Sequence, residues 1–359
     1  MHFGLTEEQE LLQQTIREFA ASELPAPKLR ALFDEGSGHD PGLWAKSAEI
    51  GLAGLTVPES YGGAGLELLD LALAFEVLGE SALPGPYLGH ALAALAIAEG
   101  GSEDQKQRWL PRLASGEAIG TVALAERNNV WECADWRVEF RDGALAGEKE
   151  FVPYAQLADL TLVGTVGGGL AVLERDAEGS RVDAVDGVDR TRALGRLELT
   201  GARAEALPAP PGTAERVLDA GRVLLAADSF GGAWKLIETT AEYTRTREQF
   251  GTPIAQFQSV KHMLADAATE IEPARGLFWY AAYAWERLPE ESPRAAATAK
   301  AHLTDRAADV SRTCVELHGG IGFTWECDVQ FWVKRAMFNR TFLGAPSAQL
   351  ERVADLGGW

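Results

Sequence analysis

The sequence predicts a multidomain protein with an N-terminal helical domain, a middle β-barrel domain and a C-terminal four-helix bundle. At 359 residues the chain exceeds the usual size of one hydrophobic core, so two or three domains are expected. Apolar residues recur at helical spacing at first, alternate with polar residues in the middle, and return to helical spacing afterwards. These changes of period place the domains at residues 1–117, 118–210 and 211–359.

The first helix of the N-terminal domain has a clear start and end. Thr6 followed by Gln9 is a capping box in its glutamine form. Leu12, Ile16 and Phe19 then form an apolar stripe, which ends close to Pro25. Shorter helices are expected in "PGLWAKSAEIG", in "LELLDLALAFEVLG" after the "YGGAG" loop, and in "SEDQKQRWLPRLASG", where Pro111 is expected to cut the helix.

The middle domain alternates apolar and polar residues around glycine-rich turns, as strands do. Asp142-Gly143 lies between two such runs and predicts a β-hairpin. Long helical blocks follow at about 213–245, 256–288, 294–317 and 328–343, joined by short loops. Four long helices in this order predict a four-helix bundle.

Composition argues against several classes of partner and of location. A net charge of −20 disfavours nucleic acid and anionic membrane surfaces. Three cysteines without a C-x-x-C pair indicate a reducing compartment, and six scattered histidines predict no metal site. The start of the chain is not a signal peptide, and the charge-free stretch 81–98 is broken by Pro and Gly, so no membrane span is expected. We therefore expect a cytoplasmic protein.

Three stretches carry more information than composition does. They are "YTRTREQFGTPIAQFQSVKHMLAD" (243–266), "ELHGGIGFTWE" (316–326) and "PESYGGAG" (58–65). Together with the helical, β, helical order, they make the chain resemble the acyl-CoA dehydrogenase family of flavoproteins over nearly its whole length. The resemblance implies FAD as cofactor, an acyl-CoA thioester as substrate, and an oligomer in which one subunit helps to bind the FAD of its neighbour.

The resemblance also implies a set of cofactor-binding residues. Arg247 would contact the pyrophosphate, and an arginine suits a diphosphate because it donates paired, charge-assisted hydrogen bonds. Glycines at a helix end let a nucleotide approach the backbone closely. Simpler interpretations stay open, since Arg247 could form a surface ion pair with Glu248 and the glycines could merely end a helix. The remaining implied residues are Phe250, Gln258, His318, Gly319, Gly320 and Gly322, and His318 could equally be a packed loop residue.

The expected catalytic base is missing. In the family a glutamate removes the α-proton of the thioester while the β-hydride passes to flavin N5, and such a proton needs a positioned carboxylate. The family's Tyr-Glu-Gly-Thr pattern aligns with Phe342-Leu343-Gly344-Ala345, so Leu343 occupies the base position. Some members carry the base directly before an arginine on the first bundle helix, where this chain has Gly221-Arg222. Neither Leu343 nor Gly221 can accept a proton.

Two segments of the middle domain depart from the family as well. The Thr-Glu-Pro-Gly-x-Gly-Ser-Asp segment matches poorly to residues 125–130, "AERNNV", and Trp-Ile-Thr-Asn becomes "FVPY" at 151–154. Both family segments touch the redox ring of the flavin. By this resemblance, the segments that would contact the flavin ring are altered in this chain. The residues that would bind the nucleotide part of the FAD of a neighbouring subunit are kept.

The preferred hypothesis is a base-free subunit that works with a homologous, base-bearing partner. Family members of this type act on steroid or other bulky CoA thioesters as α2β2 heterotetramers, and their base-free chains often end in Leu-Gly-Gly-Pro-Ser, which "FLGAPSAQL" resembles. One alternative is a self-sufficient FAD acyl-CoA dehydrogenase with Asp219 or Asp228 as a displaced base. Another is a flavin oxygenase of the same fold. The last is a non-redox module for thioester binding or assembly.

Overall fold

The structure, a computed structural model, describes residues 4–359, and contacts along the chain group them into two compact units. The bundle unit contains the described residues up to Arg30, Ala72–Leu83 and Arg222–Trp359. The sheet unit contains Ala31–Leu71 and Pro84–Gly221. The predicted order of helical, β and helical segments is confirmed. The three domain boundaries remain a prediction, since the two units combine segments from different predicted domains.

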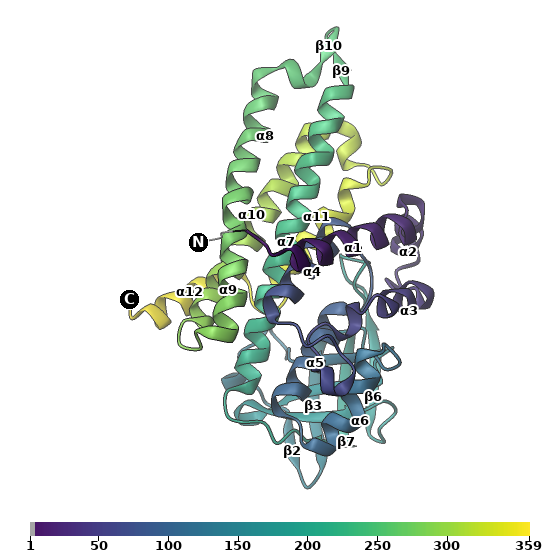
Figure 1. The fold of residues 1–359 in the computed structure, drawn as a ribbon, viewed down its shortest axis with the longest axis vertical. Coiled ribbons are helices and arrows are strands. Elements are labelled where there is room, and N and C mark those ends of the chain that lie inside the picture. The colour runs from purple at the N-terminus through teal and green to yellow at the C-terminus, as the bar shows by residue number, and fades with distance from the viewer. Residues whose placement is uncertain (1–3) are drawn as a thin grey trace. The chain divides into compact units, whose positions relative to one another are not determined.

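Helices make up both ends of the chain (Figure 1). Among the described helices, none combines the length and the apolar character needed to cross a lipid bilayer. Their bounds are α1 Glu7–Glu23, α2 Ala26–Glu35, α3 Pro41–Glu49, α4 Leu68–Glu80, α5 Tyr87–Gly100, α6 Glu103–Ala114, α7 Thr213–Thr246, α8 Gln258–Ile271, α9 Arg275–Arg287, α10 Ser292–His318, α11 Val329–Thr341 and α12 Pro346–Gly357.

Local sequence signals explain the N-terminal helices, with one exception. The capping box of α1 is present, because Gln9 N donates to Thr6 Oγ1 at 3.2 Å and Thr6 N donates to Gln9 Oε1 at 3.1 Å. The prediction that Pro111 cuts a helix was wrong, since α6 continues through it to Ala114. Pro111 lies on the exposed side, while Leu110 and Leu113 are fully buried. Their burial offsets the backbone hydrogen bond that proline cannot make.

The strands form two four-stranded sheets, in the orders β1-β4-β5-β8 and β2-β3-β7-β6. Asp142 and Gly143, both with positive φ, make the predicted hairpin between β2 and β3. The predicted barrel is not closed, because alternation identifies strands but does not say whether the sheets join at both edges. Bounds are β1 Gly120–Ala123, β2 Glu139–Arg141, β3 Ala144–Pro153, β4 Leu160–Thr165, β5 Gly169–Glu174, β6 Ser180–Val185, β7 Leu194–Arg203, β8 Glu205–Ala206, β9 Glu248–Gln249 and β10 Thr252–Pro253.

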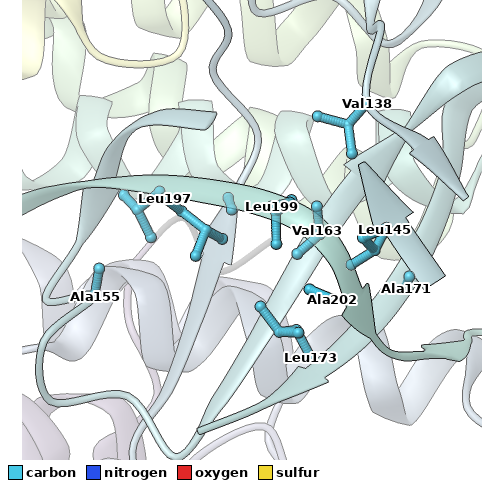
Figure 2. Packing of buried hydrophobic residues seen from close by; sticks show 11 residues of the cluster. Val138, Leu145, Ala155, Val163, Ala171, Leu173, Leu197, Leu199 and Ala202 are labelled. Atoms are coloured by element: carbon cyan, nitrogen blue, oxygen red, sulfur yellow. The ribbon is translucent and has the colours of Figure 1, made fainter. Parts of the chain in front are cut away.

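The two sheets of the sheet unit share one apolar core, shown in Figure 2. Val163 of β4 and Leu173 of β5 come from one sheet, and Leu145 of β3 and Leu197 of β7 come from the other. Each is buried, with a relative exposure of 3% or less. Burying such side chains stabilises the fold by about 1.5–3 kcal/mol each, so this core holds the connecting loops in place.

Residues 213–343, where four helical blocks were predicted, form the five α-helices α7, α8, α9, α10 and α11. The expected block 256–288 is two helices, α8 and α9, separated by the short turn Glu272–Ala274. Pro273 explains the break, since it has no N–H to continue the helical ladder. Helix α10 is the centre of this unit and packs against α8, α9, α11 and α12.

Helices α4 and α7 of the bundle unit cross at two glycines. A Cβ at Gly79 would lie 2.0 Å from the carbonyl oxygen of Asp228, and a Cβ at Gly231 would lie 1.8 Å from that of Glu76. The backbones can approach this closely only because both positions lack a side chain. Trp332 of α11 donates from its indole to the Gly79 carbonyl at 3.1 Å and so adds a third helix to the crossing.

We predict that Gly231→Ala separates α4 from α7 and destabilises the protein by about 1–3 kcal/mol or more, as overpacked core positions do. Gly276→Ala in α9 is the matched control, because a Cβ there meets no atom within 4 Å. A helical Gly→Ala change without a clash is expected to stabilise by about 0.5–1 kcal/mol. Urea unfolding of both variants checks this pair, and equal effects of the same sign would contradict the crossing.

Candidate functional site

The residues predicted to contact a nucleotide lie at the end of α7 and on the hairpin that follows it. Arg247 comes directly after α7, and its N–H donates to the Tyr243 carbonyl at 2.8 Å. Phe250 sits at the tip between β9 and β10 in the left-handed region (φ 54°) and is 94% exposed. Gln258 begins α8 and is exposed. All three side chains face solvent in this chain.

An aromatic stack joins this segment to the end of α10. The Tyr243 and His318 rings lie 4.3 Å apart and within 19° of parallel. The Tyr243 hydroxyl donates to the His318 carbonyl at 3.3 Å, and His318 Nδ1 lies 2.8 Å from the Cys314 carbonyl. His318, the last residue of α10, therefore packs against α7 and holds the glycine turn next to the end of that helix.

The glycines after His318 differ in the space that surrounds each of them. A Cβ at Gly319 (φ 64°) or at Gly320 would meet nothing within 4 Å, so this backbone faces open space. A Cβ at Gly322 would lie 2.5 Å from the Val315 carbonyl, so that glycine is required by packing. An open glycine turn beside an exposed guanidinium fits the diphosphate and nucleoside part of FAD.

Exposed apolar side chains surround the glycine turn. Phe323 is 79% exposed, and Ile321 and Trp325 are about half exposed. Large apolar groups in solvent mark contact surfaces. We call Phe250, Ile321, Phe323 and Trp325, together with Arg247, the exposed end of the bundle unit.

The two positions that could carry a base are connected through Arg222. Leu343 follows α11 in the left-handed region (φ 59°), and its side chain is fully buried. Its carbonyl lies 3.4 Å from Arg222 Nε, which donates to it, and Arg222 is the residue directly after Gly221 in α7. Neither Leu343 nor Gly221 has an ionisable group.

The carboxylate of Asp228 is not available as a displaced base. It is buried and accepts hydrogen bonds from Arg335 Nε (3.0 Å) and Nη2 (2.7 Å) and from Asn339 Nδ2 (2.6 Å). A buried ion pair with these additional bonds needs both partners in place. Asp219 is also buried. Burial raises the pKa of the Cys133 thiol, and the negative charges of Glu215, Glu132 and Asp219 add smaller effects in the same direction.

In the sheet unit, the segments aligned with the family's flavin-ring contacts are tied to each other. Lys149 Nζ donates to Glu126 Oε1 at 2.7 Å, and both are buried. Burial lowers the pKa of Lys149 to about 8 against the opposing effect of Glu126. Phe151 (φ 53°) lies at an irregularity in β3 and stacks on Trp131 at 6.4 Å. These segments are held by their own ion pair and aromatic pair.

Sequence reasoning missed Lys149 and Lys300, both fully buried, and the Tyr243–His318 stack. A signal existed for Lys300, because it shares a helical stripe with the buried Ala296 and Leu303. No comparable signal existed for the stack, since the spacing of Tyr243 and His318 along the chain says nothing of their contact.

Comparison with known proteins identifies the class. The family descriptions "Acyl-CoA dehydrogenase, N-terminal domain" and "Acyl-CoA dehydrogenase, C-terminal domain" match residues 6–117 and 212–356. Acyl-CoA dehydrogenase IpdE2 of Mycobacterium tuberculosis is 32% identical over 97% of this chain and 96% of its own length. The chain therefore belongs to the acyl-CoA dehydrogenase family.

Two solved structures are similar to this chain over nearly its whole length. The Tcur3481–Tcur3483 steroid ACAD variant superposes with a TM-score of 0.92 at 34% identity, covering 98% of each chain. The ChsE4–ChsE5 complex from Mycobacterium tuberculosis has a TM-score of 0.90 at 28% identity, over 100% of this chain and 99% of that one. Both similar structures consist of two named proteins.

We predict that Asp228→Asn lowers the free energy of unfolding by about 3–5 kcal/mol, because it leaves Arg335 charged and unpaired in the core. Asp305→Asn is the control, since the ion pair of Asp305 with Arg340 is about one-third exposed and worth up to about 1 kcal/mol. Chemical denaturation measures both. A neutral Asp228→Asn would show that the carboxylate is free for another role.

Proposed function

We propose that this chain is a base-free subunit of an FAD-dependent acyl-CoA dehydrogenase, working with a homologous partner that carries the glutamate. The reaction is α,β-dehydrogenation of an acyl-CoA thioester. A steroid or another bulky acyl group is the favoured substrate class, because the Tcur3481–Tcur3483 steroid ACAD is among the similar structures.

One observation carries the proposal. The two positions where the family places its base hold Leu343 and Gly221, and the side chain of Leu343 is fully buried. Removing the weakly acidic α-proton of a thioester needs a carboxylate within hydrogen-bond reach. Of the two carboxylates on α7 considered as a displaced base, Asp228 is committed to Arg335 and Asn339, and Asp219 is buried two residues before Gly221 on a helix that turns about 100° per residue. We infer that the base comes from another chain.

The exposed end of the bundle unit supports a shared cofactor. Arg247 and Gln258 are exposed and make none of the contacts that would bury them, and the Gly319-Gly320 backbone faces open space. We infer that Arg247 binds a diphosphate of FAD seated mainly in the partner, that Phe250 packs beside it, and that Gln258 and Gly319–Gly322 meet the adenosine. Bound FAD would supply the hydride acceptor of the reaction.

The surrounding apolar surface supports a protein partner at the same place. Phe250 and Phe323 are both largely exposed, and Trp325 is 48% exposed beneath Lys334, whose Nζ lies 3.9 Å from the ring centre. Covering such aromatic groups stabilises an interface. A partner that brings FAD to this surface would bury the apolar groups and supply the anion for Arg247 together.

We predict that the purified chain alone is colourless or nearly so. Co-expression with a homologous, glutamate-bearing acyl-CoA dehydrogenase subunit from the same genome is expected to give a yellow complex that reduces its flavin when an acyl-CoA is added. Ultraviolet–visible spectra of both preparations test this. Stoichiometric FAD and thioester dehydrogenation by the lone chain would refute the proposal, and thioester binding with no flavin in either preparation would favour a non-redox module.

Replacing Arg247 by alanine is expected to weaken FAD retention in that complex about tenfold or more, because a charge-assisted hydrogen bond to an anion contributes about 1.5–3 kcal/mol. Arg245→Ala is the matched control. It removes an equal charge two residues earlier, from an exposed guanidinium 3.5 Å from Glu242. Flavin loss during ultrafiltration measures the effect, and equal retention by the two variants would argue against a diphosphate at Arg247.

A further inference from the structure

Lys300 of α10 is a fully buried lysine whose three donors all bind backbone carbonyls. Its Nζ lies 2.7 Å from the Asn339 carbonyl, 3.3 Å from that of Arg340 and 3.1 Å from that of Gly344. The first two oxygens belong to the last turn of α11, which has no further helical N–H to accept from. The third belongs to the turn beyond it. One ammonium group therefore ties the end of α11 to the Leu343–Gly344 turn.

The charged groups around Lys300 do not neutralise it. Arg340 of α11 is paired with Asp305 of α10 at 2.8 Å, and Asp228 of α7 is paired with Arg335 of α11. Arg222 of α7 adds a second positive charge near the turn. Helix α12 contributes the uncharged Gln349. The carbonyl oxygens thus provide the stabilisation that a carboxylate provides for most buried lysines.

The turn that Lys300 holds is strained and is bound from two further sides. Leu343 adopts a left-handed conformation (φ 59°), which costs a residue with a side chain about 1–2 kcal/mol. Its carbonyl accepts from Arg222 Nε at 3.4 Å and from Gln349 Nε2 at 3.3 Å. Gly344 must be glycine here, because φ is 98° and a Cβ would lie 2.5 Å from Gln349 Nε2. Donors from α7, α10 and α12 therefore converge on two consecutive carbonyls.

We propose that Lys300, with Arg222 and Gln349, positions the Leu343–Gly344 turn and holds it closed. The inference rests on the proposed function for its consequence, because that function places this turn at the reacting end of the acyl thioester. Lys300 is a positioning residue here. It acts through the backbone of the turn.

Hydrogen–deuterium exchange of the purified chain tests this directly. In Lys300→Met, peptides covering residues 342–350 should exchange at least about tenfold faster than in the wild type at the same pH, because three carbonyls lose their donor. Peptides from the sheet unit should exchange at the wild-type rate.

Lys261→Met is the control, because Lys261 lies exposed on α8, and it should keep the wild-type exchange of this segment. Wild-type protection of residues 342–350 in Lys300→Met would overturn the inference. If Lys300→Met fails to fold, Gln349→Ala removes another donor to the same turn, and unchanged protection in that variant would overturn the inference equally. The experiment needs neither flavin nor partner. A missing yellow complex would therefore count against the proposed function and leave this result standing.

Discussion

The proposed function depends on the hydrogen-bonded, left-handed turn at Leu343 and Gly344. The bundle unit has no proton acceptor at this turn, because Leu343 occupies the position expected for the base. Helix α11 delivers the chain to this point, and donors from α7, α10 and α12 fix the two carbonyls that follow. These hydrogen bonds fix the backbone of the turn as a site needs when it must orient one side chain. The side chain at this position is that of Leu343, which is apolar and fully buried. Geometry is preserved here while the proton acceptor is absent, and the proposed dependence on a partner follows from that combination.

The residues that follow α7 and α10 differ from this buried turn, because they are exposed to solvent. The side chains of Arg247 and Phe250 are exposed to solvent, and the Gly319-Gly320 backbone faces open space. The Tyr243–His318 stack holds the hairpin and the glycine turn together, so the exposed groups are displayed on a rigid support. In the sheet unit the Glu126–Lys149 pair and the Trp131–Phe151 stack hold the loops internally.

Sequence reasoning succeeded where a residue acts through local geometry. The capping box at Thr6 and Gln9, the Asp142-Gly143 hairpin and the order of helical and β segments needed only periodicity and turn chemistry. It failed at Pro111, where burial of Leu110 and Leu113 outweighed a broken ladder, and at Pro273, which divided an expected helix. It also could not decide whether the sheets close into a barrel, because closure depends on contacts between strand edges far apart in the chain.

The candidate site was predictable only in part, for the same reason. Arg247, Phe250, Gln258 and the glycine turn stand out because they form short motifs, and Leu343 stands out because a motif is broken there. The buried donors that shape the turn, Lys300 and Gln349, come from separate helices and meet only in three dimensions. Asp228 shows the converse case. Its place on α7 made it an alternative base, and the partners that exclude this role, Arg335 and Asn339, lie more than a hundred residues away in the chain.

The crystal structure of the two-protein complex, solved with FAD and a thioether analogue of an acyl-CoA that cannot be dehydrogenated, would test the central claim most directly. The carboxylate within hydrogen-bond reach of the α-carbon is expected to belong to the partner. A carboxylate of this chain in contact with that carbon would contradict the claim that the chain cannot remove the proton by itself.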